Sequence, residues 1–169
     1  PLVALVNSFV LMKLFSVIWL SLIILSVYHI SNKNKNTLLL LVASPIIWYL
    51  TPWINPIQLA SLFFLWSYYF ISKYNIDGKI KSLIYSGLLA GLSAAIWDTA
   101  LYFAIILGLV YLIDKRLVYS IVYFVFVSLG LIPKLILDFF VYGFPLNTTL
   151  RHVMASVIFF LEGGIYGPG

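Results

Sequence analysis

The chain lacks cysteine altogether and is poor in charged residues, and each shortage excludes a class of protein. Without cysteine it has no disulfide, no thiol nucleophile and no cysteine-ligated metal. Only 9% of its 169 residues are charged, whereas soluble domains contain about 25%. Hydrophobic residues make up 63% of the chain, and the mean hydropathy is +1.09. These values predict one transmembrane domain over residues 1–169, and a start at Pro1 without Met suggests a fragment of a longer membrane protein.

The basic residues fall mainly in three short stretches separated by long apolar runs. These stretches are residues 31–36, 72–81 and 114–116, whereas the turns at 51–56 and 97–99 contain no Lys or Arg. Because cytoplasmic loops of membrane proteins collect Lys and Arg, we expect a multi-pass protein of the cell membrane with the three basic stretches in the cytoplasm. Loops 51–56 and 144–149 are then outside. This placement also explains the net charge of +5, so no nucleic-acid partner is expected.

The apolar runs predict an all-α, polytopic transmembrane bundle of about six spans. A bilayer core of about 30 Å needs roughly 20 helical residues, and the expected spans are residues 2–30, 37–50, 57–71, 82–96, 99–113 and 117–132. The first is either one tilted helix or a helix that bends near Lys13. Pro45 is expected to kink the second span, and a tight turn at Trp97 and Asp98 is favoured over one long helix.

Two further features concern helix contacts and the end of the chain. Gly87, Gly91 and Ser93 have the small-residue spacing that permits close helix packing. After Pro133, an outer loop over residues 144–149 should lead into a helix over 150–161. That helix would lie in the membrane interface or re-enter the membrane.

No complete catalytic motif occurs, so ionisable residues at membrane depth are the functional candidates. Asp98 either caps the helix that begins at Thr99 or binds substrate or a metal. Glu162 is either a solvated loop carboxylate or a base or metal ligand. His29 and His152 lie near opposite ends of the chain, so a two-histidine metal site is not expected.

Three basic residues could bind an anion. Lys134 either pairs with Asp138 at i,i+4 spacing along one helix or faces a lipid phosphate. Arg151 and His152 open the last expected helix. There they either form an anion site, for which a helix N-terminus is suited, or snorkel toward headgroups.

The order of several short motifs resembles one enzyme family. The motifs are Pro1-Leu2, Ala43-Ser44-Pro45, Ser86-Gly-Leu-Leu-Ala-Gly-Leu-Ser93, Thr99-Ala-Leu-Tyr102, Leu131-Ile-Pro133 and Tyr142-Gly-Phe-Pro-Leu146. In this order they resemble the C-type glycosyltransferase superfamily, whose polytopic members use polyprenyl-phosphate-linked sugars. The resemblance implies an enzyme that takes a sugar from such a donor and passes it to an acceptor outside the cytoplasm.

The chain departs from that family in two places. The family's catalytic acid usually lies in the first outer loop, so here the catalytic residue is expected upstream of Pro1, with Asp98 as a weak substitute. Where relatives often carry a basic residue after the glycine-rich helix, this chain has Trp97 and Asp98. Lys134, Arg151 and His152 are then the residues expected to bind the donor phosphate, and a divalent cation is an open option.

A second hypothesis belongs to another class of protein. A chain of short spans with many aromatic residues and few polar groups also suits a non-catalytic membrane subunit that packs within a larger complex. Membrane lipids and protein subunits would be its partners. A transporter fits less well, because the spans lack a mid-membrane cluster of ionisable groups and no inverted repeat is evident.

Overall fold

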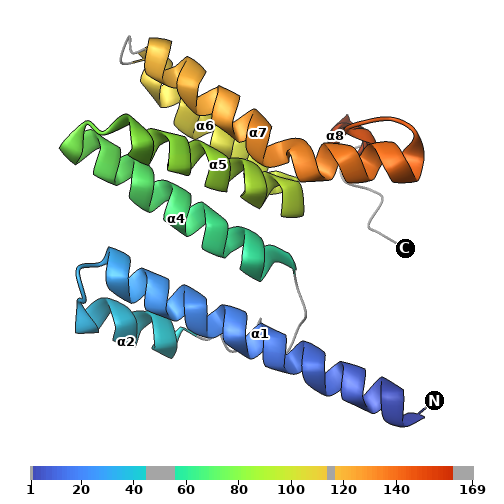
Figure 1. Cartoon of the computed structure of the whole chain (residues 1–169). Coiled ribbons are helices and arrows are strands. Elements are labelled where there is room, and N and C mark those ends of the chain that lie inside the picture. Colours follow the sequence, from blue (N-terminus) through green and yellow to red (C-terminus); the bar gives the residue numbers. More distant parts are fainter. Residues whose placement is uncertain (1, 45–55, 114–116, 162–169) are drawn as a thin grey trace. The chain divides into compact units, whose positions relative to one another are not determined.

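The computed structural model describes residues 2–44, 56–113 and 117–161, and helices account for nearly all of them. The helices are α1 (Leu2–Ile30), α2 (Lys35–Ala43), α4 (Pro56–Asp77), α5 (Ile80–Ile96), α6 (Thr99–Ile113), α7 (Leu117–Tyr142) and α8 (Asn147–Leu161) (Figure 1). The described residues contain no strand. The expected all-α class is therefore confirmed for this part of the chain.

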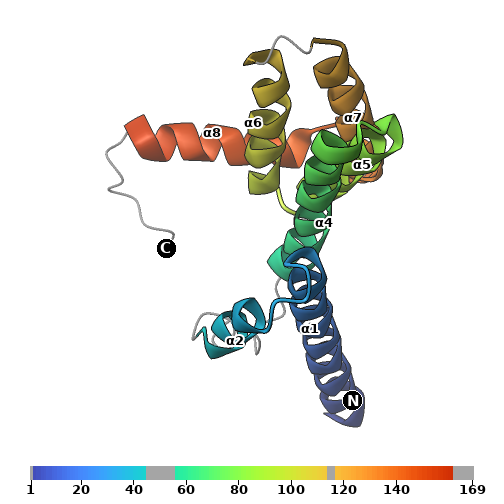
Figure 2. The ribbon, with the colours of Figure 1, turned by 90° about the vertical axis from the view of Figure 1, so that its left-hand side faces the viewer.

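The helices form two compact units, which are considered separately. The first is Pro1–Gly130 and the second is Leu131–Gly169, with the boundary inside α7. In the first unit α4 packs against α5 and α1, and α5 also packs against α6. Figures 1 and 2 show α2 lying beside α1, and the two helices are in contact.

Two of the described helices, by length and composition, could cross a membrane. These are Lys13–Ile30 within α1 and Leu117–Tyr142, whereas Ile80–Ile96 and Thr99–Val110 are apolar but shorter. Large apolar side chains on these helices are exposed, for example Leu25 at 60%, and such surfaces mark membrane or partner contacts. These two helices favour membrane association, but they do not amount to the expected bundle of six spans.

α2 ends at Ala43, before Pro45, and the expected kink at Pro45 lies outside the described residues. Ser44 has φ −68° and ψ 120°, which is extended backbone, and a residue that precedes proline is disfavoured in the helical region. The nine residues of α2 span about 13.5 Å at 1.5 Å per residue, less than half of a bilayer core. Residues 45–50, the rest of the expected span, lie outside the described ranges, as do 51–55 and 114–116.

Four other helices are longer than expected, and α5 is longer by two residues because it begins at Ile80. α4 continues past Ile71 to Asp77, where Gly78 adopts φ +65° and donates its N–H to the carbonyl of Tyr74 at 2.8 Å. A glycine in the left-handed region is a common helix terminator, so the turn between α4 and α5 shrinks to two residues. α7 runs through Pro133, whereas the expected span ended at Ile132. α8 begins at Asn147 and not at residue 150.

Two open questions from the sequence are settled. α1 is one continuous helix of 29 residues, so the alternative with a bend near Lys13 is wrong. α5 ends at Ile96 and α6 begins at Thr99, which confirms the tight turn at Trp97 and Asp98.

Serine residues join α4 to α5. Ser67 Oγ donates to the carbonyl of Ser86 at 2.9 Å, and Ser86 Oγ donates to the carbonyl of Ser67 at 2.8 Å. Nearer the start of α4, Ser93 Oγ donates to the carbonyl of Ala60 at 2.7 Å. All three serines are fully buried, so polar contacts that bind one helix to the next lie inside the unit.

Glycines bring α5 against α7. A Cβ built on Gly87 would lie 2.7 Å from the carbonyl oxygen of Tyr123, and one built on Gly91 would lie 2.8 Å from the Cα of Gly130. Only glycine allows backbones to approach so closely. The small-residue spacing on α5 therefore produces the expected close contact, and its partner is α7.

Within the first unit, the helices that precede the three basic stretches end on the same side. Figure 1 shows the C-terminal ends of α1, α4 and α6 at the left of this unit. The turn between α5 and α6 lies at the opposite end, together with the start of α4. The unit therefore has one end flanked by basic residues and one end whose described turn, at Trp97 and Asp98, contains no Lys or Arg.

Candidate functional site

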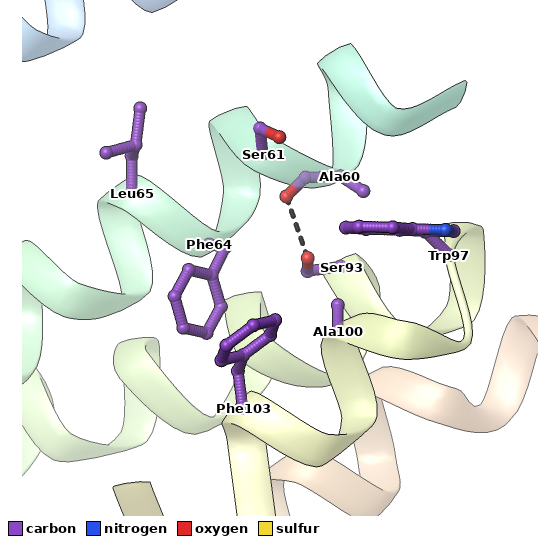
Figure 3. Close-up of a pocket in the computed structure, with 8 residues that line it drawn as sticks. All are labelled: Ala60, Ser61, Phe64, Leu65, Ser93, Trp97, Ala100 and Phe103. Carbon is purple, nitrogen blue, oxygen red and sulfur yellow. Dashed lines mark hydrogen bonds between the residues drawn. The ribbon is translucent and has the colours of Figure 1, made fainter. Parts of the chain in front are cut away.

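An apolar cavity of about 350 Å³ lies between α4 and the turn that joins α5 to α6 (Figure 3). Its lining residues are Ala60, Ser61, Phe64, Leu65, Ser93, Trp97, Ala100 and Phe103. The cavity is at the end of the first unit opposite the basic turns. Asp98, a candidate from the sequence, directly follows the lining residue Trp97, so the cavity and this candidate lie together.

The walls of this cavity are suited to a hydrocarbon chain. The rings of Phe64 and Phe103 meet at 5.7 Å between centroids with an interplanar angle of 55°, and Figure 3 shows them together on one side. Ser93 Oγ already donates to the carbonyl of Ala60, so this hydroxyl proton is committed. A site with so few polar groups binds a hydrocarbon far better than a sugar, which needs many hydrogen-bond partners.

Asp98 occupies the N-cap position of α6, next to the cavity. Its carbonyl accepts the N–H of Leu101 at 3.0 Å, and the carbonyl of Trp97 accepts the N–H of Ala100 at 2.9 Å. Asp is among the preferred residues at this position. The position agrees with the capping interpretation, and the nearness of the cavity keeps a role in binding open.

In the second unit, Asp138 connects α7 to the first turn of α8. Its Oδ2 accepts the backbone N–H of Thr148 at 3.0 Å, and its carboxylate also accepts the Thr148 hydroxyl, at 2.8 Å to Oδ2. Asp138 is only 4% exposed, and Lys134, one turn earlier on α7, is 8% exposed. A carboxylate at a helix N-terminus is favoured by the backbone N–H groups and the helix dipole. Asp138 therefore fixes the start of α8.

Arg151 and His152 lie in the second turn of α8, and both are exposed. Arg151 Nε donates to Oδ1 of Asn147 at 3.2 Å, and its guanidinium is 5.6 Å from the centre of the Tyr142 ring. Because α8 begins three residues earlier than expected, these two residues do not open it. The backbone N–H of Thr148, at the actual start of α8, is bound by Asp138 of the same chain.

The candidate residues are thus divided between the two units. Lys134, Arg151 and His152 belong to the second, and Asp98 belongs to the first. Glu162 lies outside the described residues. Among the described residues, no group of three or more His, Cys, Asp or Glu side chains is arranged to hold a metal ion.

A second cluster, which the sequence did not predict, lies at the basic end of the first unit. His29 of α1 stacks on Trp66 of α4, with ring centroids 6.0 Å apart, and also meets the ring of Tyr69 at 5.9 Å. The available signal was the spacing of Trp66, Tyr69 and Lys73, which places all three on one face of a helix.

No family model matches this chain, and searches of curated proteins and of solved structures find no significant match.

Proposed function

We propose that the chain is a multi-pass membrane glycosyltransferase of the C type, acting on a polyprenyl-phosphate-linked sugar at the non-cytoplasmic side. The observation that carries this proposal is the apolar cavity beside Trp97 and Asp98, at the end of the unit away from the basic turns. An isoprenoid chain requires such a cavity near the membrane surface where its phosphate lies. The motif order that resembles this superfamily supports the same reaction.

In the proposed reaction, the bond between the sugar's anomeric carbon and the donor phosphate oxygen breaks, and a bond from that carbon to the acceptor oxygen forms. The acceptor hydroxyl loses its proton to a carboxylate, and polyprenyl phosphate leaves. Asp98 is the described carboxylate nearest to the cavity in sequence and is assigned to the acceptor hydroxyl. Arg151 and His152, which belong to the second unit, remain the candidates from the sequence for the donor phosphate, whose charge basic groups stabilise. Lys134 is the third basic candidate.

The direct test is photo-crosslinking with a polyprenyl monophosphate that carries a diazirine near its phosphate end. In vesicles containing the full chain, we expect crosslinked peptides from α4 near Phe64 and from α6 near Phe103. Ser61→Phe should reduce crosslinking about fifteenfold, because excluding two CH₂ groups from the cavity removes about 1.6 kcal/mol of burial. Ser21→Phe, an equal change at an exposed position of α1, is the control. Label spread evenly over exposed α1 and α7 would contradict the site.

A second candidate function is that of a non-catalytic membrane subunit. The specific observation in its favour is that two charged residues of the second unit have partners within the chain. Asp138 binds Thr148, and Arg151 binds Asn147 and lies on Tyr142. Gentle extraction followed by mass measurement of the intact assembly separates the two functions. A stoichiometric protein partner without specific crosslinking favours the subunit, and the converse favours the enzyme.

A further inference from the structure

We infer that α1 and α4 form a binding site for an anionic phospholipid at the basic end of the first unit. The acyl chain lies in a groove between the two helices, and the headgroup phosphate lies at the mouth, near His29 and Lys73. This site is distinct from the cavity beside Trp97. It rests on the membrane placement proposed above, but it does not depend on sugar transfer.

The groove has the size and lining for a lipid chain. Its volume is about 350 Å³, and it is lined by Leu22, Leu25, Ser26, His29, Leu62 and Trp66. The polar atoms of Ser26 and Trp66 are already bonded, since Trp66 Nε1 donates to Ser26 Oγ at 2.9 Å and Ser26 Oγ donates to the carbonyl of Leu22 at 2.6 Å. The surface offered to an occupant is therefore hydrocarbon and indole, and His29 is the ionisable residue in the lining.

The mouth of the groove combines two nitrogen-bearing side chains with aromatic rings. His29 and Lys73 are both exposed, and both contact Tyr69. The His29 ring is 5.9 Å from the Tyr69 ring, and Lys73 Nζ is 6.0 Å from the centre of the same ring. Both side chains thus lie against one ring, and a phosphate placed beside that ring would accept hydrogen bonds from them in the proposed site.

The charge around this mouth selects an anionic headgroup. Lys33 and Lys35 follow α1, the helix that supplies His29. Asp77 is the nearest acid along α4, and its Oδ1 accepts the backbone N–H of Lys79 at 2.9 Å. A phosphatidylcholine would bring its own positive group against Lys73, whereas a phosphatidylglycerol brings only the phosphate. One basic residue at a membrane surface is worth about 1 kcal/mol of attraction to anionic lipid, so direct contact of the phosphate with Lys73 is expected to favour phosphatidylglycerol about fivefold.

Trp66 lines the groove, so its fluorescence reports occupancy directly. The chain contains five tryptophans, and replacing the other four with phenylalanine leaves Trp66 as the only indole. In mixed vesicles, phosphatidylglycerol with brominated chains should quench Trp66 at about one fifth of the mole fraction needed for brominated phosphatidylcholine. Leu25→Phe, which narrows the groove, should remove the saturable part of this quenching.

Two variants that remove one positive charge each distinguish a specific lipid site from nonspecific attraction of anionic lipid to the basic surface. The selectivity is the ratio of the mole fractions of brominated phosphatidylcholine and phosphatidylglycerol that give equal quenching. Lys73→Gln should bring this ratio close to one, and Lys73→Arg should restore it. Lys79→Gln removes the same charge from the adjacent turn and should leave most of the selectivity. Circular dichroism of each variant establishes that its helices are intact.

The outcomes that overturn the inference differ from those that overturn the membrane placement or the enzyme. Equal quenching by the two brominated lipids, or equal loss of selectivity in Lys73→Gln and Lys79→Gln, overturns the phospholipid site alone. No quenching by either lipid overturns the placement of α1 and α4 in the bilayer, and the phospholipid site with it. Crosslinking at the cavity beside Trp97 decides the glycosyltransferase separately.

Discussion

Replacing Gly91 with alanine should force α5 and α7 apart, although alanine is the better helix former. A Cβ built on Gly91 would lie 2.8 Å from the Cα of Gly130 and 3.0 Å from the carbonyl carbon of Val127. Non-bonded carbon atoms prefer separations of about 3.5–4 Å. Both neighbours are backbone atoms that cannot rotate away. The two helices must therefore separate by about 1 Å along this contact.

The sign of the effect follows from two opposing terms. Overpacking of this kind lowers the free energy of unfolding by about 1–3 kcal/mol. We expect a value in the upper half of this range, because the backbone must move at two contacts. The higher helix propensity of alanine offsets about 1 kcal/mol of this cost, which leaves a net loss of about 1–2 kcal/mol. Gly108 is the matched control, because a Cβ there would meet the far end of the Phe124 side chain, which can swing aside about its Cα–Cβ bond, whereas backbone atoms cannot. Gly108→Ala should be neutral or stabilising by up to about 1 kcal/mol.

Equilibrium unfolding in mixed micelles measures both variants against the wild-type chain. The expected result is a lower free energy of unfolding for Gly91→Ala and an unchanged or higher value for Gly108→Ala. Equal stability of the two variants would refute the argument, because it would mean that α5 and α7 do not approach as closely as the glycine contacts require.

Three further outcomes test other contacts. Ser67→Ala and Ser86→Ala should couple by about 0.6 kcal/mol, and by no more than about 1.7, in a double-mutant cycle of unfolding; strictly additive losses would contradict the reciprocal bonds. Asp138→Ala should destabilise the start of α8 by about 1–2 kcal/mol, seen as faster amide exchange there, and unchanged exchange would contradict the capping role. Because the chain has no native cysteine, Lys79→Cys and Asp98→Cys can each be labelled with a membrane-impermeant maleimide in sealed vesicles. The two are expected to react from opposite sides, and reaction from the same side would overturn the proposed topology.

The fold was predictable from the sequence where residues close together in the chain determine the structure. The glycines of α5 and the turn at Asp98 were readable from the sequence, because small-residue spacing and a polar interruption of an apolar run have direct structural consequences. Prolines were harder to interpret. Pro45 follows the end of α2, whereas Pro133 lies within a continuous α7. The same residue thus ends one helix and is accommodated in another, and the surrounding contacts that decide between these outcomes are not local in sequence.

The candidate site was predictable only as a set of residue types. Asp138 accepts hydrogen bonds from Thr148, ten residues away, a partner that the i,i+4 spacing of Lys134 and Asp138 does not predict. The partner depends on how the chain returns from α7 into α8, and the i,i+4 rule contains no information on that turn. The stacking of His29 on Trp66 joins positions 37 residues apart. Spacing on one helix could indicate only the α4 half of this cluster.

The distribution of side-chain types in the first unit is itself an argument about its surroundings. Ser67, Ser86, Ser93 and Ser120 are among its most completely buried residues, whereas leucine, isoleucine and phenylalanine side chains are widely exposed. In water this arrangement would be unfavourable, because apolar burial stabilises a soluble core. In lipid the outer apolar side chains gain nothing by moving inward, and small or hydroxyl-bearing residues allow close helix contact and interhelical bonds. Serine inside and leucine outside therefore favour a bilayer around this unit, for a reason that is independent of the length of its helices.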